Sequence, residues 1–221
     1  MEKLEEIAEK IRQSFDDLNK SRDMALSQSR MLIRHCSQAI RAVHREDTDV
    51  MNDHLGEAGE LARTLTTGLK NYPNLYHTGY TQDALKEYAE AKITCALILN
   101  KPLPSPEEID VIHATWLKGL SEVVGELRRR CLDLLRQGYS SEAERLLGLM
   151  DDIYSVLVTM DYPDAITYGL RRQTDIARSI IERTRGDLTF SLQGENLATA
   201  ISNLSQQLLQ EKDHSDNPQS H

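Results

Sequence analysis

The sequence contains few aromatic residues and no long apolar run, and each shortage excludes a class of protein. Aromatic side chains make up 5% of the 221 residues, too few for the stacking platforms on which single-strand binders with barrel folds hold bases. No apolar run approaches the roughly 20 residues that a membrane-spanning helix needs, and the acidic start of the chain is unlike a secretory signal. The sequence therefore predicts a soluble, cytoplasmic protein with no membrane partner.

Cysteine is also scarce, and the three residues Cys36, Cys95 and Cys131 are far apart. An odd number without a CxxC pair predicts reduced, structural thiols. The histidines form no HxxxH or HExxH pair, which gives a zinc site little support. The GxSxG, GxGxxG and GxxxxGK[ST] motifs are absent too, so the usual hydrolase and nucleotide-binding loops are not indicated.

Positive charge is in the minority, because 26 Lys and Arg residues face 35 Asp and Glu residues, for a net charge of −9. This balance argues against a generally basic nucleic-acid coat but leaves a local basic patch open. Arginine clusters bind phosphate well, whereas charged helix stripes are more often solvated faces. Two arginine-rich segments supply the candidate nucleic-acid contacts, which are Arg30, Arg34, Arg41, Arg171, Arg172 and Arg178.

Apolar residues recur at steps of three and four along most of the chain, and no strand pattern is present. Neither Gly nor Pro precedes Gly56, which predicts one very long helix ending near residue 46. Such a helix would span about 60 Å at about 1.5 Å per residue. Its far end therefore needs another subunit or a long bundle to pack against.

Further helices are expected over residues 48–70, 81–99, 106–137 and 140–160, with one or two more over 161–210. The expected N-caps are Thr48 or Asp49, Thr81 and Ser105. The predicted fold is an all-α, elongated bundle of about seven helices, forming one domain over residues 1–210. The polar residues 211–221 are expected to form a disordered tail.

The helix expected over residues 81–99 is apolar around most of its circumference, except for a narrow polar stripe with Glu87, Glu90 and Thr94. A helix that is apolar nearly all round is normally buried, so the stripe faces something specific. The two carboxylates lie one turn apart and repel each other unless a cation, a proton or water intervenes. The stripe is either ordinary solvent-facing surface or half of a site for Mg²⁺, which prefers oxygen ligands.

Glu122 and Glu126 repeat this arrangement at i, i+4 on the next long helix. A short connection favours antiparallel packing of neighbouring helices, so the two carboxylate pairs could face each other. Alternatively, Glu126 pairs with Arg129 and Arg130 on its own helix, an interaction worth only tenths of a kcal/mol. Spacing alone leaves both interpretations open.

The segment GLRRQTDIARSIIERTRGDLT (residues 169–189) resembles the C-terminal signature of the translin family, which includes translin and translin-associated factor X. SRDMALSQSRMLIR (residues 21–34) is similar to the first-helix segment of the family. LKEYAEA (85–91) and LSEVVGELRRRC (120–131) resemble stretches of translin-associated factor X, in the same order. The chain is identified as a member of the family similar to that branch, and the lack of nuclear import or export signals favours a prokaryotic or archaeal member.

This resemblance implies an all-helical fold that assembles into a hollow homo-oligomer, an octamer, with single-stranded RNA or DNA bound inside. It also implies an endoribonuclease dependent on Mg²⁺, with Mn²⁺ as a substitute. The catalytic and metal-binding acids fall on Glu87, Glu90, Glu122 and Glu126. Glu122 stands where the active branch has Asp, which shifts the carboxylate by about one methylene, and Mg²⁺ is demanding in its geometry. The alternative is a binding-only shell like translin.

Overall fold

The computed structural model describes residues 1–215, with side chains described up to residue 209. Every regular element in this part is a helix, which confirms the all-α prediction. The predicted tail over residues 211–221 begins inside the last helix, and residues 216–221 lie outside the described part. None of the helices in residues 1–215 combines the length and apolarity needed to cross a membrane. The elements are α1 (Glu2–His44), α2 (Thr48–Gly68), α3 (Pro73–Tyr76), α4 (Gly79–Ile98), α5 (His113–Leu135), α6 (Ser141–Val158), α7 (Asp164–Thr167) and α8 (Leu170–Ser215).

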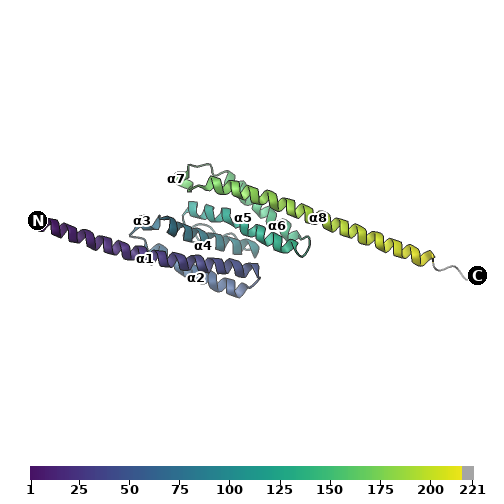
Figure 1. Cartoon of the computed structure of the whole chain (residues 1–221), viewed down its shortest axis with the longest axis horizontal. Helices are drawn as coiled ribbons and strands as arrows, with labels where there is room; N and C mark the ends of the chain where they lie inside the picture. The colour runs from purple at the N-terminus through teal and green to yellow at the C-terminus, as the bar shows by residue number, and fades with distance from the viewer. Residues whose placement is uncertain (216–221) are drawn as a thin grey trace, which may run out of the picture.

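The long helices lie side by side, with α4 and α5 in the middle (Figure 1). α1 packs on α2 and α4, α4 packs on α5, and α5 packs on α6 and α8. Leu32, Leu85, Leu127 and Leu146 are fully buried where these helices meet in one apolar core. The nearly all-round apolarity of α4 follows from this central place, because helices cover it on several sides.

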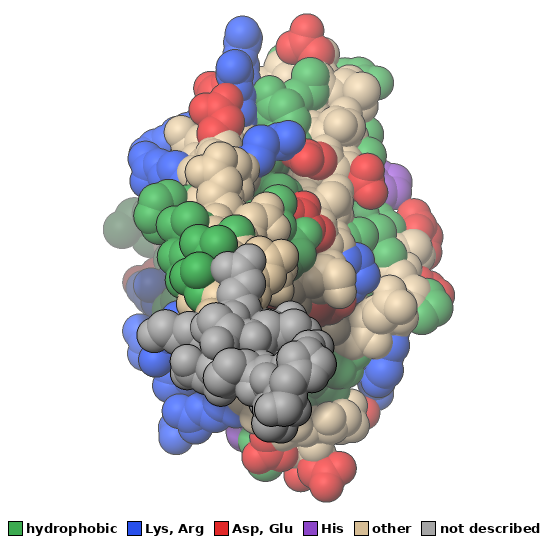
Figure 2. Space-filling view, turned by 90° about the vertical axis from the view of Figure 1, so that its right-hand side faces the viewer, with side chains coloured by type: hydrophobic (Ala, Val, Ile, Leu, Met, Phe, Trp, Pro, Cys, Tyr) green, Lys and Arg blue, Asp and Glu red, His purple; other side chains and the backbone are tan. Residues whose placement is uncertain are grey.

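The N-terminal half of α1 and the C-terminal half of α8 project from the bundle in opposite directions (Figure 1). No residue of α1 before Ala25 is buried, and no residue between Leu188 and residue 209 of α8 is buried. Figure 2, which views the molecule from the C-terminal end, shows hydrophobic side chains grouped on the projecting helix. Exposed apolar side chains follow both projections, namely Leu4, Ile7, Ile11 and Phe15 on α1 and Phe190, Leu197, Ile201, Leu204, Leu208 and Leu209 on α8.

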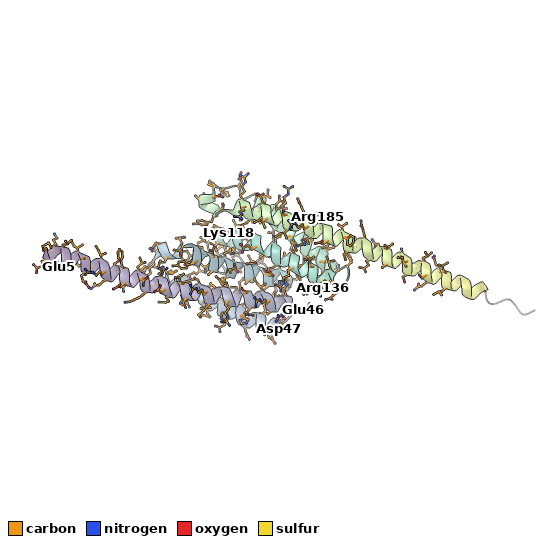
Figure 3. All side chains as sticks on the ribbon, in the orientation of Figure 1. Glu5, Glu46, Asp47, Lys118, Arg136 and Arg185 are labelled. Carbon is orange, nitrogen blue, oxygen red and sulfur yellow. The ribbon has the colours of Figure 1, made fainter. Side chains whose placement is uncertain are left out.

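The turn between α1 and α2 is fixed to the C-terminal end of α5. Glu46, in this turn, pairs with Arg130 of α5 at 2.6 Å. Figure 3 shows Glu46 and Asp47 at this end of the bundle, near Arg136. Glu46 and Arg136 also line the same surface pocket. The end of α1 is therefore held beside α5, although the two helices are separated by more than 60 residues of chain.

Two predicted helix starts are corrected by the structure. Asp47, rather than Thr48 or Asp49, caps α2, because its carboxylate accepts a hydrogen bond from a backbone N–H of the first turn. α4 begins after Thr78, so Thr81 lies inside the helix. The Thr81 side chain is buried, and its hydroxyl donates to a backbone carbonyl at 2.9 Å.

The helix predicted to begin after Ser105 begins only at His113. The local signal is genuine, because Ser105 and Glu108 exchange the two hydrogen bonds of a capping box, at 2.7 and 3.2 Å. The segment nevertheless continues only as turns. Asp110 has a φ of 54°, which interrupts a right-handed helix, while Ile109 beside it is buried in the core. Burial of this short segment therefore overrides its capping signal.

Candidate metal centre and arginine surfaces

Three carboxylates from two adjacent helices meet in the middle of the bundle. They are Glu87 and Glu90 of α4 and Glu122 of α5, named here the acidic cluster, and one ligand oxygen of each lies within 4.8 Å of the others. Glu87 and Glu90 share a face because they lie about one turn apart, and that face meets α5. Within the described residues, this is the one group of three or more His, Cys, Asp or Glu side chains placed to share a metal ion.

Gly119 allows α4 and α5 to approach closely beside the acidic cluster. A Cβ atom added at Gly119 would lie 2.9 Å from the Ala89 Cβ and 3.0 Å from both the Glu90 nitrogen and the Lys86 carbonyl oxygen. Side-chain carbons do not normally approach so closely, so any larger residue would push the helices apart. Because Glu122 follows Gly119 by about one turn, this contact helps to set the separation of the carboxylates.

Glu90 is the most buried member of the cluster, with 8% of the residue exposed. Within the described residues its side chain makes no hydrogen bond and no ion pair. Burial, together with the negative charges of Glu87 and Glu122, raises the pKa of Glu90 to about 8, although the charge of Lys86 lowers it. The Glu90 oxygens are not among the fully buried unpartnered side-chain atoms, so water, a proton or a cation can reach the carboxylate, and the last two stabilise it in this partly desolvated position.

Lys86 supplies positive charge to the other two carboxylates. Its ammonium lies 3.0 Å from Glu87 and also contacts Glu122, and its side chain is 12% exposed. Although burial lowers the pKa of Lys86, its hydrogen bonds to Glu122 and Glu87 raise it above the usual value. The lysine therefore remains charged and bridges the two helices.

Glu126 lies one turn beyond the acidic cluster on α5 but has a different partner. The Nε2 of His44, in the last turn of α1, lies 2.6 Å from its carboxylate, and Arg129 lies at 3.5 Å. The hydrogen bond from His44 lowers the pKa of Glu126 below its usual value, despite partial burial. Of the four predicted acids, the structure therefore brings three together and holds the fourth against α1.

Three residues that shape the carboxylate site were not identified from the sequence, namely Lys86, His44 and Gly119. Lys86 precedes Glu87 directly, but neighbouring residues point about 100° apart on a helix, so only its long side chain allows the contact. Gly119 could have been noticed, because an isolated glycine within a helical pattern often has a packing reason. His44 is 82 residues from Glu126, and no local pattern indicates this contact.

The six predicted arginine contacts are all exposed, but they lie on two helices on opposite sides of the bundle (Figure 1). In helical projection, Arg41 lies within about 60° of His44, so the α1 arginines flank the side of α1 that contacts Glu126. Arg178, on α8, pairs along its own helix with Glu182 at 2.9 Å. A single chain therefore presents two separate arginine surfaces, Arg30, Arg34 and Arg41 on α1 and Arg171, Arg172 and Arg178 on α8.

The fold and the acidic cluster define an all-α bundle protein with a carboxylate centre between its two middle helices. No family model matches the sequence. The chain is 33% identical to the uncharacterized protein MJ0175 of Methanocaldococcus jannaschii over 178 residues, which are 80% of this chain and 78% of that protein. It is also similar to AfC3PO solved in complex with duplex RNA, with 30% identity and a TM-score of 0.79 over 84% of this chain and 96% of that one.

A further solved structure, apo-NeC3PO, shares the fold with a TM-score of 0.77 and 23% identity, over 83% of this chain and 96% of that one. The chain belongs to the translin family. This membership confirms the resemblance drawn from residues 169–189 and from the shorter segments.

Proposed function

We propose that this protein is a metal-dependent endoribonuclease that cleaves single-stranded RNA at the acidic cluster. The observation that carries the proposal is the meeting of Glu87, Glu90 and Glu122 from two helices. Membership of the translin family and the likeness to AfC3PO, which was solved with duplex RNA, support a role in binding or processing RNA. A cluster of one buried and two partly buried carboxylates is otherwise costly, because like charges repel more strongly where water is partly excluded.

The three carboxylates fit Mg²⁺ or Mn²⁺. All three offer hard oxygen donors, and Glu90 has no other partner within the described residues. Oxygens bound to one Mg²⁺ at about 2.0–2.1 Å lie at most about 4.2 Å apart, so small side-chain rotations from the present spacing of up to 4.8 Å are sufficient. The extra methylene of Glu122, compared with Asp, gives its carboxylate the reach for such a rotation.

Glu87, Glu90 and Glu122 would hold the ion in this proposal. When bound, Mg²⁺ supplies an activated water at neutral pH and offsets negative charge on the attacked phosphate. The residues of the chain hold the carboxylates in position and supply a negative electrostatic potential. The tight contact at Gly119 fixes the two helices, and the negative charge of nearby Glu126 adds to the potential that raises the pKa of Glu90 and attracts a cation.

We further propose that the protein acts as a homo-oligomer, with the octamer implied by the family resemblance as the expected form. At about 100° per residue, the apolar residues 190, 197, 201, 204 and 208 of α8 fall within an arc of about 60°. The exposed apolar residues of α1 form a similar stripe. Two projecting helices with unpaired apolar stripes are suited to packing against other copies of the chain, which would bring arginine surfaces of different subunits around a shared interior.

A binding-only shell for single-stranded RNA or DNA is the second candidate, and Lys86 is the observation that favours it. The lysine already places a cation between Glu87 and Glu122. In this alternative, the carboxylates join α4 to α5 through Lys86, and no chemistry takes place there.

Cleavage of end-labelled single-stranded RNA separates the two candidates. We expect cleavage with Mg²⁺ or Mn²⁺ and none with a chelator, and we expect the Glu90→Gln variant to lose it. Glu107→Gln is the matched control, because Glu107 is exposed and lies outside the cluster. Retarded migration of RNA without cleavage in the wild-type protein would support the binding-only shell. Parallel reactions with duplex RNA and single-stranded DNA define the substrate class.

A further inference from the structure

Lys86 is a cation that the fold itself places in the acidic cluster. Its ammonium contacts a carboxylate on its own helix, Glu87 at 3.0 Å, and one on the neighbouring helix, Glu122. Lysine is almost never this buried unless it is paired, and here 12% of its side chain is exposed. The lysine is therefore a built part of the cluster rather than a surface charge that happens to lie nearby.

The ammonium of Lys86 contacts two of the three carboxylates that would hold a metal ion. The oxygens of Glu87 and Glu122 that accept hydrogen bonds from Lys86 belong to carboxylates that would also be metal ligands. An ammonium and a divalent cation within a few ångströms of each other repel strongly in a partly buried site. Even where each cation takes a different oxygen, the two compete for the same pair of carboxylates through this repulsion.

We propose that Lys86 sets the metal affinity of the acidic cluster by acting as its resident counter-cation, which must leave Glu122 before a divalent ion binds. The inference rests on the proposed function, because it takes the cluster as the metal site. Lys86 keeps the carboxylates together when metal is absent and weakens metal binding through competition. It is a positioning residue for the cluster, and its effect is visible in metal binding itself, without a measurement of cleavage.

The test compares Mn²⁺ binding to the full-length wild-type protein and to the Lys86→Met variant, by calorimetry and by electron paramagnetic resonance of the bound ion. Removal of the competing charge is expected to tighten Mn²⁺ binding by about tenfold or more. Without metal, Lys86→Met is expected to unfold at a lower temperature, and Mn²⁺ is expected to raise that temperature more than in the wild type.

Lys92→Met is the matched control for the loss of one positive charge. Lys92 lies on the same helix, α4, and forms no ion pair within the described residues, so its variant is expected to bind Mn²⁺ within about twofold of the wild type. Lys86→Gln provides a second neutral variant if Lys86→Met does not fold. Lys86→Arg keeps the charge and is expected to keep the weaker wild-type affinity.

Equal or weaker Mn²⁺ binding in both neutral variants would overturn the role of Lys86. If Glu90→Gln still abolished binding in that case, the proposed metal site would stand. Absence of Mn²⁺ binding from the wild type and from both neutral variants would overturn the proposed metal site together with this inference.

Discussion

His44, in the last turn of α1, donates a hydrogen bond from Nε2 to the carboxylate of Glu126 on α5 over a distance of 2.6 Å. The His44 side chain is 2% exposed, so the bond is shielded from water and joins two helices that are distant in sequence. It holds the end of α1 beside α5, one turn from the acidic cluster.

Loss of this bond is expected to destabilise the bundle. His44→Ala removes a buried donor, leaves Glu126 without its partner and opens space under α1, so a loss of about 2–3 kcal/mol in the free energy of unfolding is expected. Urea unfolding measures this loss. His44→Gln, which keeps a side-chain donor, is expected to lose less. Similar losses in both variants would contradict the role of the hydrogen bond, because glutamine keeps a donor as well as most of the side-chain volume.

Gly119→Ala is expected to disturb the acidic cluster through the backbone. The new Cβ would lie 2.9 Å from the Ala89 Cβ, so α4 and α5 must separate, at a cost of about 1–3 kcal/mol. Weaker Mn²⁺ binding is expected to accompany this loss. Gly125→Ala is a matched control on the same helix, because nothing lies within 4 Å of its added Cβ. Replacing that glycine should stabilise α5 by about 0.5–1 kcal/mol.

Unchanged Mn²⁺ affinity in Gly119→Ala would contradict the role given to the close helix contact. Stability and metal affinity are measured on the same preparations, so that a folding defect is distinguished from a local change at the cluster.

The raised pKa of Glu90 predicts a dependence of stability on pH. Its folded pKa of about 8, against an ordinary value of 4.5, means that the folded protein holds this proton more tightly than the unfolded chain does. The resulting stabilisation is fully present below pH 4.5 and is lost as the pH rises from there through about 8. Unfolding between pH 5 and 9 with a chelator present should therefore show a decline that Glu90→Gln reduces.

Metal binding should have the opposite dependence on pH, because the ion and the proton compete for the same carboxylate. Mn²⁺ affinity is expected to increase from pH 6 to about pH 8 and then to level off. An affinity independent of pH over this range would indicate that Glu90 does not bind the ion.

The projecting part of α8 is expected to carry an oligomer contact. Leu204 and Leu208 lie on the same exposed apolar stripe, and placing glutamates there introduces charge into a helix interface. The double variant Leu204→Glu, Leu208→Glu is expected to dissociate into smaller species in light scattering while its circular dichroism stays helical. Gln206→Glu lies on the opposite face and is expected to keep the wild-type mass. An unchanged mass in the double variant would remove this stripe from the interface.

The sequence predicted the features that depend on local periodicity and on a long family signature. The helix over residues 81–99, its carboxylate stripe and the all-α class follow from spacings of three and four residues. Local signals failed where distant packing decides the structure. Ser105 makes the hydrogen bonds of a helix cap. The segment after it nevertheless forms turns instead of a helix, because Ile109 is buried in the core.

The acidic cluster was predictable in composition and only partly in geometry. Glu87, Glu90 and Glu122 meet, which is one of the two interpretations that their spacing left open, whereas Glu126 is held by His44. The bridging role of Lys86 could not be predicted, because it depends on the side-chain conformation and on the distance between α4 and α5. The spacing of apolar residues along a helix does not indicate which side chains tens of positions apart are in contact.

Metal binding at the acidic cluster is best tested by a crystal structure of the wild-type protein with Mn²⁺, with data collected for the anomalous signal of the ion. We expect an anomalous peak bound by Glu87, Glu90 and Glu122, with the ammonium of Lys86 moved away from Glu122. Lys86 still bridging Glu87 and Glu122, with no anomalous peak among the three carboxylates at saturating Mn²⁺, would contradict metal binding at the cluster.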